Sequence, residues 1–243
     1  MVEINLKTLL LFAGLVFILT LAVNMYTVIF GVYPVITGSG LEDFEEYVKV
    51  YYVKQKIYPV TIDSTAGRVT VPIEGKVTVF VPQYVRCPDI CHYETTIMKY
   101  LMLKLKDEGL LDEVVFVTVE VDPLRGTLQD AERYISENLY PLGIDAEWIW
   151  LSGEDIDALK RLWLQLGISV QRDPETGLIQ HTAGFYVVSR SGTLMYFIGP
   201  TSEGWKAPDK VADALYIVVK AVVEGQEIDP GHPLAKIVIE GKP

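Results

Sequence analysis

Cysteine and histidine are scarce in this chain. Its 243 residues include two cysteines and three histidines. Two cysteines cannot form a disulfide framework. With three histidines, a structural zinc site with four ligands would need carboxylates or a ligand from another molecule. We therefore expect the two sulfur atoms to serve chemistry rather than architecture.

Positive charge is also sparse. The chain has 21 Lys and Arg residues against 32 Asp and Glu residues, a formal net charge of −11. No Lys/Arg cluster suited to tracking phosphates occurs, so we expect no nucleic-acid partner. A Gly-rich phosphate loop, a Ser-His-Asp order and an H-E-x-x-H motif are absent as well, which argues against nucleotide-binding enzymes and the common hydrolases.

The amino-terminal stretch lacks charge altogether. No charged side chain occurs from Thr8 to Leu41, and about 20 apolar residues suffice to span a bilayer. A cleaved signal peptide is the alternative, but no A-x-A site follows the apolar run. We predict a retained transmembrane helix within residues 1–40. Lys7 before it and acidic residues after it favour a single-pass cell-membrane protein with its soluble domain on the outer face.

The remaining sequence predicts one folded α/β domain. Residues 41–57 are expected to be a helix or spacer, 58–224 the domain, and 225–243 a tail with a solvated His232. Turn signals and apolar periodicity predict a hairpin over 58–72 and a strand–helix–strand unit over 75–121. They then predict a helix over 127–138, a strand over 148–151, a helix over 156–166, a hairpin over 168–180, an antiparallel pair over 184–198 and a helix over 209–224.

Both cysteines lie where the first core strand gives way to a helix, in Cys87-Pro88-Asp89-Ile90-Cys91. With Cys87 near the N-cap and Pro88 at the first helical position, Cys91 would follow one turn later. The positive end of a helix stabilises a thiolate. Two adjacent thiolates suit Cu(I) or a reversible disulfide. A purely structural disulfide is the weaker alternative, since so short a loop constrains the unfolded chain little.

These features together resemble the Sco/SenC family of copper-binding cytochrome c oxidase assembly proteins. The resemblance rests on the C-x-x-x-C motif, Tyr84 before it, the Val-Asp-Pro-Leu-Arg sequence from Val121, and His181-Thr182 after a hairpin. It covers about Tyr58 to Glu224. It implies a thioredoxin-like fold with an N-terminal β-hairpin extension and a further hairpin inserted before the ββα half.

The resemblance also implies a function. Cys87, Cys91 and His181 would bind copper, as Cu(I) or Cu(II), and the protein would deliver it to the dinuclear copper site of cytochrome c oxidase subunit II. Two thiolates and one imidazole form a sound trigonal Cu(I) site. His181 alone could equally be a satisfied polar group at the start of a strand.

The sequence departs from the family pattern at two positions. His92 replaces the usual proline after the second cysteine, and we interpret it as an exposed residue of the first helical turn rather than an extra ligand. Gly126 replaces the usual aspartate, which removes a carboxylate near the site. Asp122 and Arg125 follow a core strand, where they could belong to the site or form a turn cap and a surface salt bridge.

A thiol-disulfide oxidoreductase is the competing function. It would keep the copper-site cysteines of an oxidase subunit reduced, with Cys87 and Cys91 as its catalytic pair. Thioredoxin-type reductants normally use C-x-x-C, so the third intervening residue and His181 favour a metallochaperone that is not an enzyme. A peroxidase of the peroxiredoxin type would need a different loop around its cysteine.

Overall fold

The computed structural model describes residues 35–36 and 40–228. In this part of the chain, eight strands form one mixed sheet in the order β2-β11-β10-β5-β6-β7-β3-β4. These strands are β2 (Val48–Lys56), β3 (Val60–Ser64), β4 (Gly67–Val71), β5 (Val77–Gln83), β6 (Val114–Glu120), β7 (Trp148–Leu151), β10 (Phe185–Val188) and β11 (Thr193–Pro200). A separate hairpin consists of β8 (Val170–Arg172) and β9 (Ile179–His181). The shortest strands are β1 (Val35–Ile36) and β12 (Glu227–Ile228).

Four α-helices accompany the strands in the described residues: α2 (Cys91–Asp107), α3 (Leu128–Leu139), α4 (Ile156–Leu166) and α5 (Pro208–Val223). Short 3-10 turns lie at Glu42–Phe44, Leu111–Glu113, Tyr140–Leu142 and Gly204–Lys206. The predicted βαβ unit is β5–α2–β6, and the predicted ββα unit is β10–β11–α5. The mixed α/β, thioredoxin-like architecture expected from the sequence is therefore confirmed.

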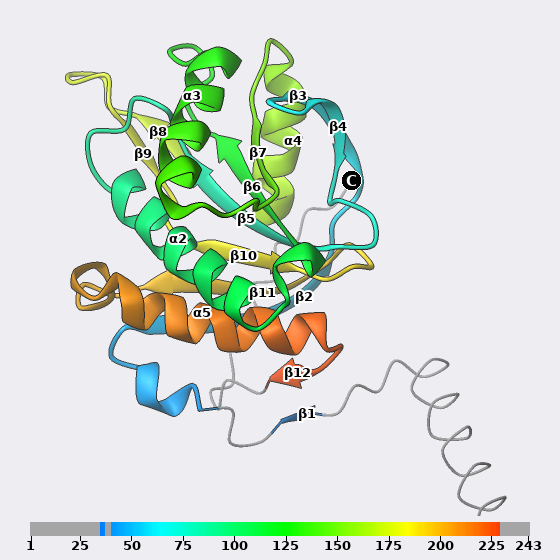
Figure 1. Ribbon diagram of the computed structural model, residues 1–243. Coiled ribbons are helices and arrows are strands. Elements are labelled where there is room, and N and C mark those ends of the chain that lie inside the picture. The colour runs from blue at the N-terminus through cyan, green and yellow to red at the C-terminus, as the bar shows by residue number, and fades with distance from the viewer. Residues whose placement is uncertain (1–34, 37–39, 229–243) are drawn as a thin grey trace, which may run out of the picture. The chain divides into compact units, whose positions relative to one another are not determined.

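The centre of the sheet is buried on both faces. Strands β5, β6 and β7 run parallel, and every residue of β5 and β6 is buried. Val79 and Phe116 belong to the hydrophobic cluster that includes α2 and α5, whereas Phe80 and Val117 belong to the one that includes α4. Continuous apolar strands are typical of parallel sheets covered by helices on both sides. In Figure 1, α2 and α5 lie side by side along one face.

Local sequence signals fix the ends of two helices near the sheet edge. Thr127 caps α3, where its hydroxyl accepts the Asp130 N–H and the Asp130 carboxylate accepts the Thr127 N–H. Asp155 caps α4, which ends at Gly167 in the left-handed region with φ 73°. Such caps satisfy N–H and C=O groups that a helix end leaves unpaired. The predicted starts of these helices are confirmed.

Two local predictions were wrong. The segment 41–57 is not a helix or spacer throughout, because β2 occupies Val48–Lys56 and pairs with β11 in the sheet. Its Val and Tyr residues give it the composition of a strand. Helix α2 begins at Cys91 with Ile90 as N-cap, so Cys87 and Pro88 precede the helix instead of opening it.

The predicted membrane anchor lies outside the described residues. In the described ranges, no helix is both long and apolar enough to cross a bilayer. Most of the predicted tail also lies outside these ranges, including His232.

Candidate metal centre

The two cysteines lie next to one another at the carboxyl end of β5. The Cys87 N–H donates to the Tyr84 carbonyl in a turn, at 3.1 Å, and Cys91 is the first residue of α2. Both are free thiols, and their exposed fractions are 7% and 3%. A tight turn thus brings Cys87 next to Cys91 at the start of α2. The two cysteines are close although the residues between them are not part of the helix.

The surroundings of the two sulfurs separate their acidities. The pKa of the Cys87 thiol falls from 9.0 to about 4, chiefly because Cys91 donates a hydrogen bond to it and also because the N–H groups of Asp89 and Cys91 do so, which together outweigh the opposing effect of burial. Burial raises the pKa of the Cys91 thiol, and its hydrogen bond to Cys87 adds to this rise. Cys87 is therefore the thiolate of the pair, and Cys91 the thiol that stabilises it.

His181 reaches the cysteines from the end of β9. Its ring meets the Tyr84 ring edge-on with the centroids 6.0 Å apart. Its Nδ1 lies 3.0 Å from the Thr182 carbonyl oxygen. Because a carbonyl oxygen can only accept, Nδ1 carries the proton and Nε2 has the free lone pair. Nε2 is buried and has no hydrogen-bond partner in the described residues.

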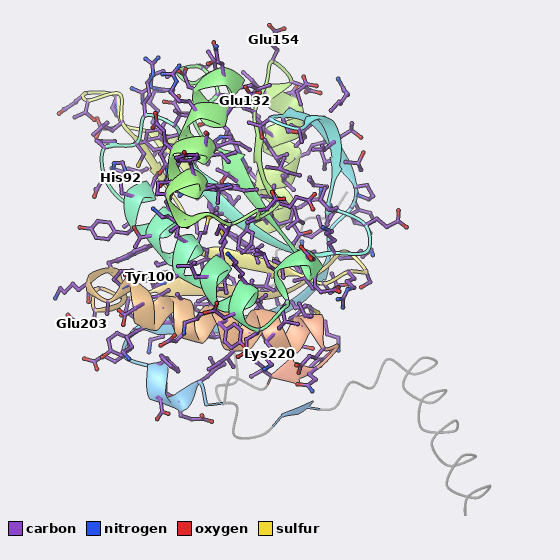
Figure 2. The ribbon with its side chains drawn as sticks, in the orientation of Figure 1. His92, Tyr100, Glu132, Glu154, Glu203 and Lys220 are labelled. Atoms are coloured by element: carbon purple, nitrogen blue, oxygen red, sulfur yellow. The ribbon has the colours of Figure 1, made fainter. Side chains whose placement is uncertain are left out.

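The structure thus brings together the three residues singled out from the sequence, Cys87, Cys91 and His181. In the described part of the chain, however, no three His, Cys, Asp or Glu side chains are grouped as closely as a bound metal ion requires. His92 is exposed at the start of α2 (Figure 2). This position agrees with its interpretation as a surface residue.

The space beside Gly126 is taken by another carboxyl group. A Cβ atom at Gly126 would lie 3.5 Å from Glu120 Oε2 and 3.4 Å from a Val85 methyl group. The Glu120 carboxyl is 1% exposed and accepts the Asp122 N–H at 2.8 Å and the Trp150 indole N–H at 3.1 Å. Burial raises its pKa to about 7. A carboxyl group therefore persists near this position, although Gly126 carries none.

Asp122 and Arg125 form more than a turn cap or a surface salt bridge. The Asp122 side chain is 1% exposed and pairs with both Arg125 and Arg172, the latter at 2.5 Å. Both arginines also donate to the Gly177 carbonyl, at 2.7 and 3.0 Å. This network ties the end of β6 to the hairpin that bears His181.

The polar residues behind the cysteines were not predicted from the sequence. The Gln83 amide donates to the Cys91 carbonyl at 3.0 Å and to the Thr95 hydroxyl at 3.1 Å. Glu94 is fully buried in the first turn of α2 and accepts the Gly184 N–H at 3.0 Å. Helical spacing could have revealed Glu94, because it lies on the same face as Cys91, Met98, Leu101 and Leu105, all of them buried.

The SCO1/SenC family model matches residues 61–216, well over half of the chain. The chain belongs to the SCO1/SenC family. The family predicted from the cysteine motif and the distant histidine is therefore confirmed.

Individual Sco proteins are similar to this chain over different lengths. "Protein SCO1 homolog 1, mitochondrial" of Arabidopsis thaliana is 28% identical over 127 residues, which are 51% of this chain and 36% of that relative. The match thus spans about a third of the curated relative.

Two solved Sco structures show the same fold. The Arabidopsis thaliana ScoI structure with copper bound has a TM-score of 0.52 and 24% identity, covering 65% of this chain and 96% of that one. The structure of BsSco, described as a Sco family cytochrome c oxidase assembly protein with a disulfide switch, has a TM-score of 0.56 and 22% identity, covering 72% and 96%. At these identities the likeness is one of fold.

Proposed function

We propose that this Sco family protein is a copper chaperone. It binds copper through Cys87, Cys91 and His181 and delivers it to the dinuclear copper site of cytochrome c oxidase subunit II. Membership of the SCO1/SenC family and the copper-bound Arabidopsis thaliana relative support the choice of metal. Copper is the cargo here, so the site must hold it and also release it.

The observation that carries the proposal is the state of His181. Its Nδ1 is engaged by the Thr182 carbonyl at 3.0 Å, and its buried Nε2 has no partner in the described residues. Leaving a buried nitrogen unpaired costs about 1–3 kcal/mol. A metal ligand with its other ring nitrogen fixed by a backbone carbonyl has this arrangement. The imidazole is thus prepared to donate its Nε2 lone pair to a metal ion.

The donor set fits copper. Two sulfurs and one imidazole are soft to borderline ligands, which favour Cu(I) over Mg²⁺ or Ca²⁺. The Cys87 thiolate is already formed near neutral pH, because its pKa is about 4. Cys91 would lose its proton on binding, since only the thiolate ligates. The sulfurs and the imidazole must also move closer together to share one ion.

A copper titration of the reduced full-length chain tests this function. We expect one Cu(I) per chain by metal analysis after competition with a Cu(I) chelator. His181→Ala should weaken Cu(I) binding by about 10-fold or more through loss of one ligand, while thiol–disulfide redox activity remains.

His92→Ala is the matched control, because His92 is an exposed histidine one residue after Cys91. Its affinity should equal that of the wild type. Unchanged copper affinity in His181→Ala would exclude the three-ligand site.

A thiol-disulfide oxidoreductase is the second candidate, and one observation favours it. Cys87 is a thiolate beside a thiol that can close a disulfide with it, which is the starting arrangement for disulfide exchange. BsSco, similar in fold, is described as having a disulfide switch. This function would be established if Cys87 and Cys91 repeatedly reduced the disulfide of an oxidised copper-site peptide, and if His181→Ala left the copper affinity unchanged.

We also propose that residues 1–40 anchor the protein in the cell membrane, with the domain on the outer face. The uncharged stretch from Thr8 to Leu41 supports an anchor. Sedimentation of the full-length chain with membranes, resistant to high salt and alkaline carbonate, is the expected result. Release of the chain by carbonate would contradict a spanning anchor.

A further inference from the structure

One buried acid near the site takes no part in the ligand set described above. Glu94 is fully buried in the first turn of α2, three residues after Cys91. Its Oε2 is buried and has no hydrogen-bond partner in the described residues. A buried carboxyl group is costly unless it makes compensating bonds. We therefore expect the buried Glu94 side chain to make a specific stabilising contact.

That contact joins the cysteine helix to the histidine segment. Glu94 Oε1 accepts the Gly184 N–H at 3.0 Å, across 90 residues of sequence. Gly184 lies three residues after His181, just as Glu94 lies three residues after Cys91. A single hydrogen bond between these two positions therefore spans the gap between the two sides of the proposed copper site.

The Gly184 backbone has little freedom to find another acceptor. Its φ is +139°, and a Cβ atom there would lie 2.5 Å from the Ile198 carbonyl oxygen. The segment after His181 is thus pressed against β11, and the direction of its N–H is set by that contact. Within the described residues, the acceptor of this N–H is the Glu94 side chain.

We propose that Glu94 is a positioning residue for His181: its side-chain oxygen, carried on the helix that begins with Cys91, holds the segment from His181 to Gly184 beside the cysteines, so that the imidazole can join them on one metal ion. This proposal rests on the proposed copper function. It requires a side chain of the length of Glu with an acceptor oxygen, and it does not require a carboxylate. Burial, which raises the pKa of Glu94 well above its usual value, agrees with a role for the uncharged group.

Two conservative variants of Glu94 distinguish the effect of side-chain length from that of the carboxyl group. Glu94→Gln keeps the length of the side chain and an acceptor oxygen but removes the acid. Glu94→Asp keeps the acid but is one methylene shorter, so its oxygen cannot reach Gly184 from the same backbone. A positioning role predicts that Glu94→Gln retains Cu(I) binding through His181 and that Glu94→Asp weakens it. A role for Glu94 as metal ligand or proton donor predicts that Gln fails.

The experiment measures Cu(I) affinity by chelator competition and the Cu(II)–thiolate absorption and nitrogen hyperfine coupling of the loaded full-length chain. Glu94→Asp should lower Cu(I) affinity by about 10-fold and weaken the nitrogen coupling. Glu94→Gln should retain both. In the His181→Ala background, Glu94→Asp should have no further effect, because both changes remove the same imidazole contribution.

The matched control is Glu120→Asp. Glu120 is also a buried glutamate that accepts a backbone N–H, from Asp122 at 2.8 Å. Within the described part of the chain, its carboxyl group has no bond to residues 181–184. Glu120→Asp should lose stability without the change in nitrogen coupling. Equal losses of affinity and coupling in Glu94→Asp and Glu120→Asp would overturn the proposal, as would a Glu94→Gln variant as weak as Glu94→Asp.

A measurement on the copper-free chain tests the positioning role of Glu94 separately from the proposed copper function. In the reduced apo chain, Glu94→Asp should shift the His181 ring resonances and speed amide exchange at Gly184, whereas Glu94→Gln should preserve both. If the wild type fails to bind copper through His181, the copper function falls, and these apo signals still decide whether Glu94 positions the ring. Unchanged His181 and Gly184 signals in Glu94→Asp would refute the positioning role.

Discussion

The number of protons released on Cu(I) binding is a direct consequence of the unequal cysteines. Cys87 has a pKa of about 4, whereas burial raises that of Cys91 above its usual value. At pH 8 the pair thus carries one proton, on Cys91. Because both sulfurs must bind as thiolates, adding Cu(I) at pH 8 should release about one proton per chain.

The alternative count is clearly different. Two thiols with the ordinary pKa of 9.0 would together release about 1.8 protons at pH 8. The experiment therefore adds Cu(I) and measures the number of protons released per copper ion bound.

Anaerobic calorimetry in buffers of different ionisation enthalpy measures this stoichiometry. Cu(I) is supplied from the same chelator complex in each buffer, and the slope of observed enthalpy against buffer ionisation enthalpy gives the proton count. A slope near two would show that Cys87 is not a thiolate in the free protein, and a slope near zero would show that Cys91 carries no proton. Thiolate absorbance provides the control: its midpoint should lie near pH 4 and rise in Cys91→Ala, which removes the main hydrogen bond to Cys87.

Three further predictions concern stability. Leu101→Ala should cost about 2–5 kcal/mol in denaturant unfolding because Leu101 is fully buried in α2, whereas the control Leu164→Ala, at a side chain 69% exposed, should stay within about 0.5 kcal/mol. Glu120 has a folded pKa of about 7 against an ordinary 4.5, so its stabilising effect is complete below pH 4.5 and lost as pH rises through 7. Relative to Glu120→Gln, the wild type should lose about 3 kcal/mol across that range in unfolding measured against pH, and parallel pH profiles would contradict this. Gly184→Ala should cost at least about 2 kcal/mol in thermal unfolding, since its Cβ would lie 2.5 Å from the Ile198 oxygen, and wild-type stability would refute that close approach.

Much of the domain could be predicted because its signals are local. The apolar runs of β5 and β6, the caps at Thr127 and Asp155 and the turn at Gly167 each act within a few residues of sequence. Their periodicity and turn chemistry do not depend on distant contacts. The strand β2 escaped prediction for the opposite reason. Its partner is β11, more than a hundred residues away, and its mixed charged and aromatic sequence has no strict alternation.

In the candidate site, too, local features could be predicted from the sequence and contacts between distant residues could not. The C-x-x-x-C spacing and the family resemblance singled out Cys87, Cys91 and His181 as candidate ligands. They could not show that Cys87 precedes the helix, because the turn at Tyr84 is a matter of backbone geometry. The contact between Glu94 and Gly184 and the pairing of Asp122 with Arg172 join residues at least 50 positions apart. No spacing rule in one sequence reveals such contacts.

The hairpin of β8 and β9 stands apart from the eight-stranded sheet, and this separation bears on how an ion could leave. In the proposed copper site, the two sulfur donors would lie beside the main sheet, whereas the nitrogen donor would lie on this hairpin, whose two strands pair only with each other in the described residues. In that proposed site, an incoming thiolate from an acceptor would displace the imidazole while both sulfurs stay bound to the ion. Handover would then proceed by ligand substitution in steps, with the sheet undisturbed throughout.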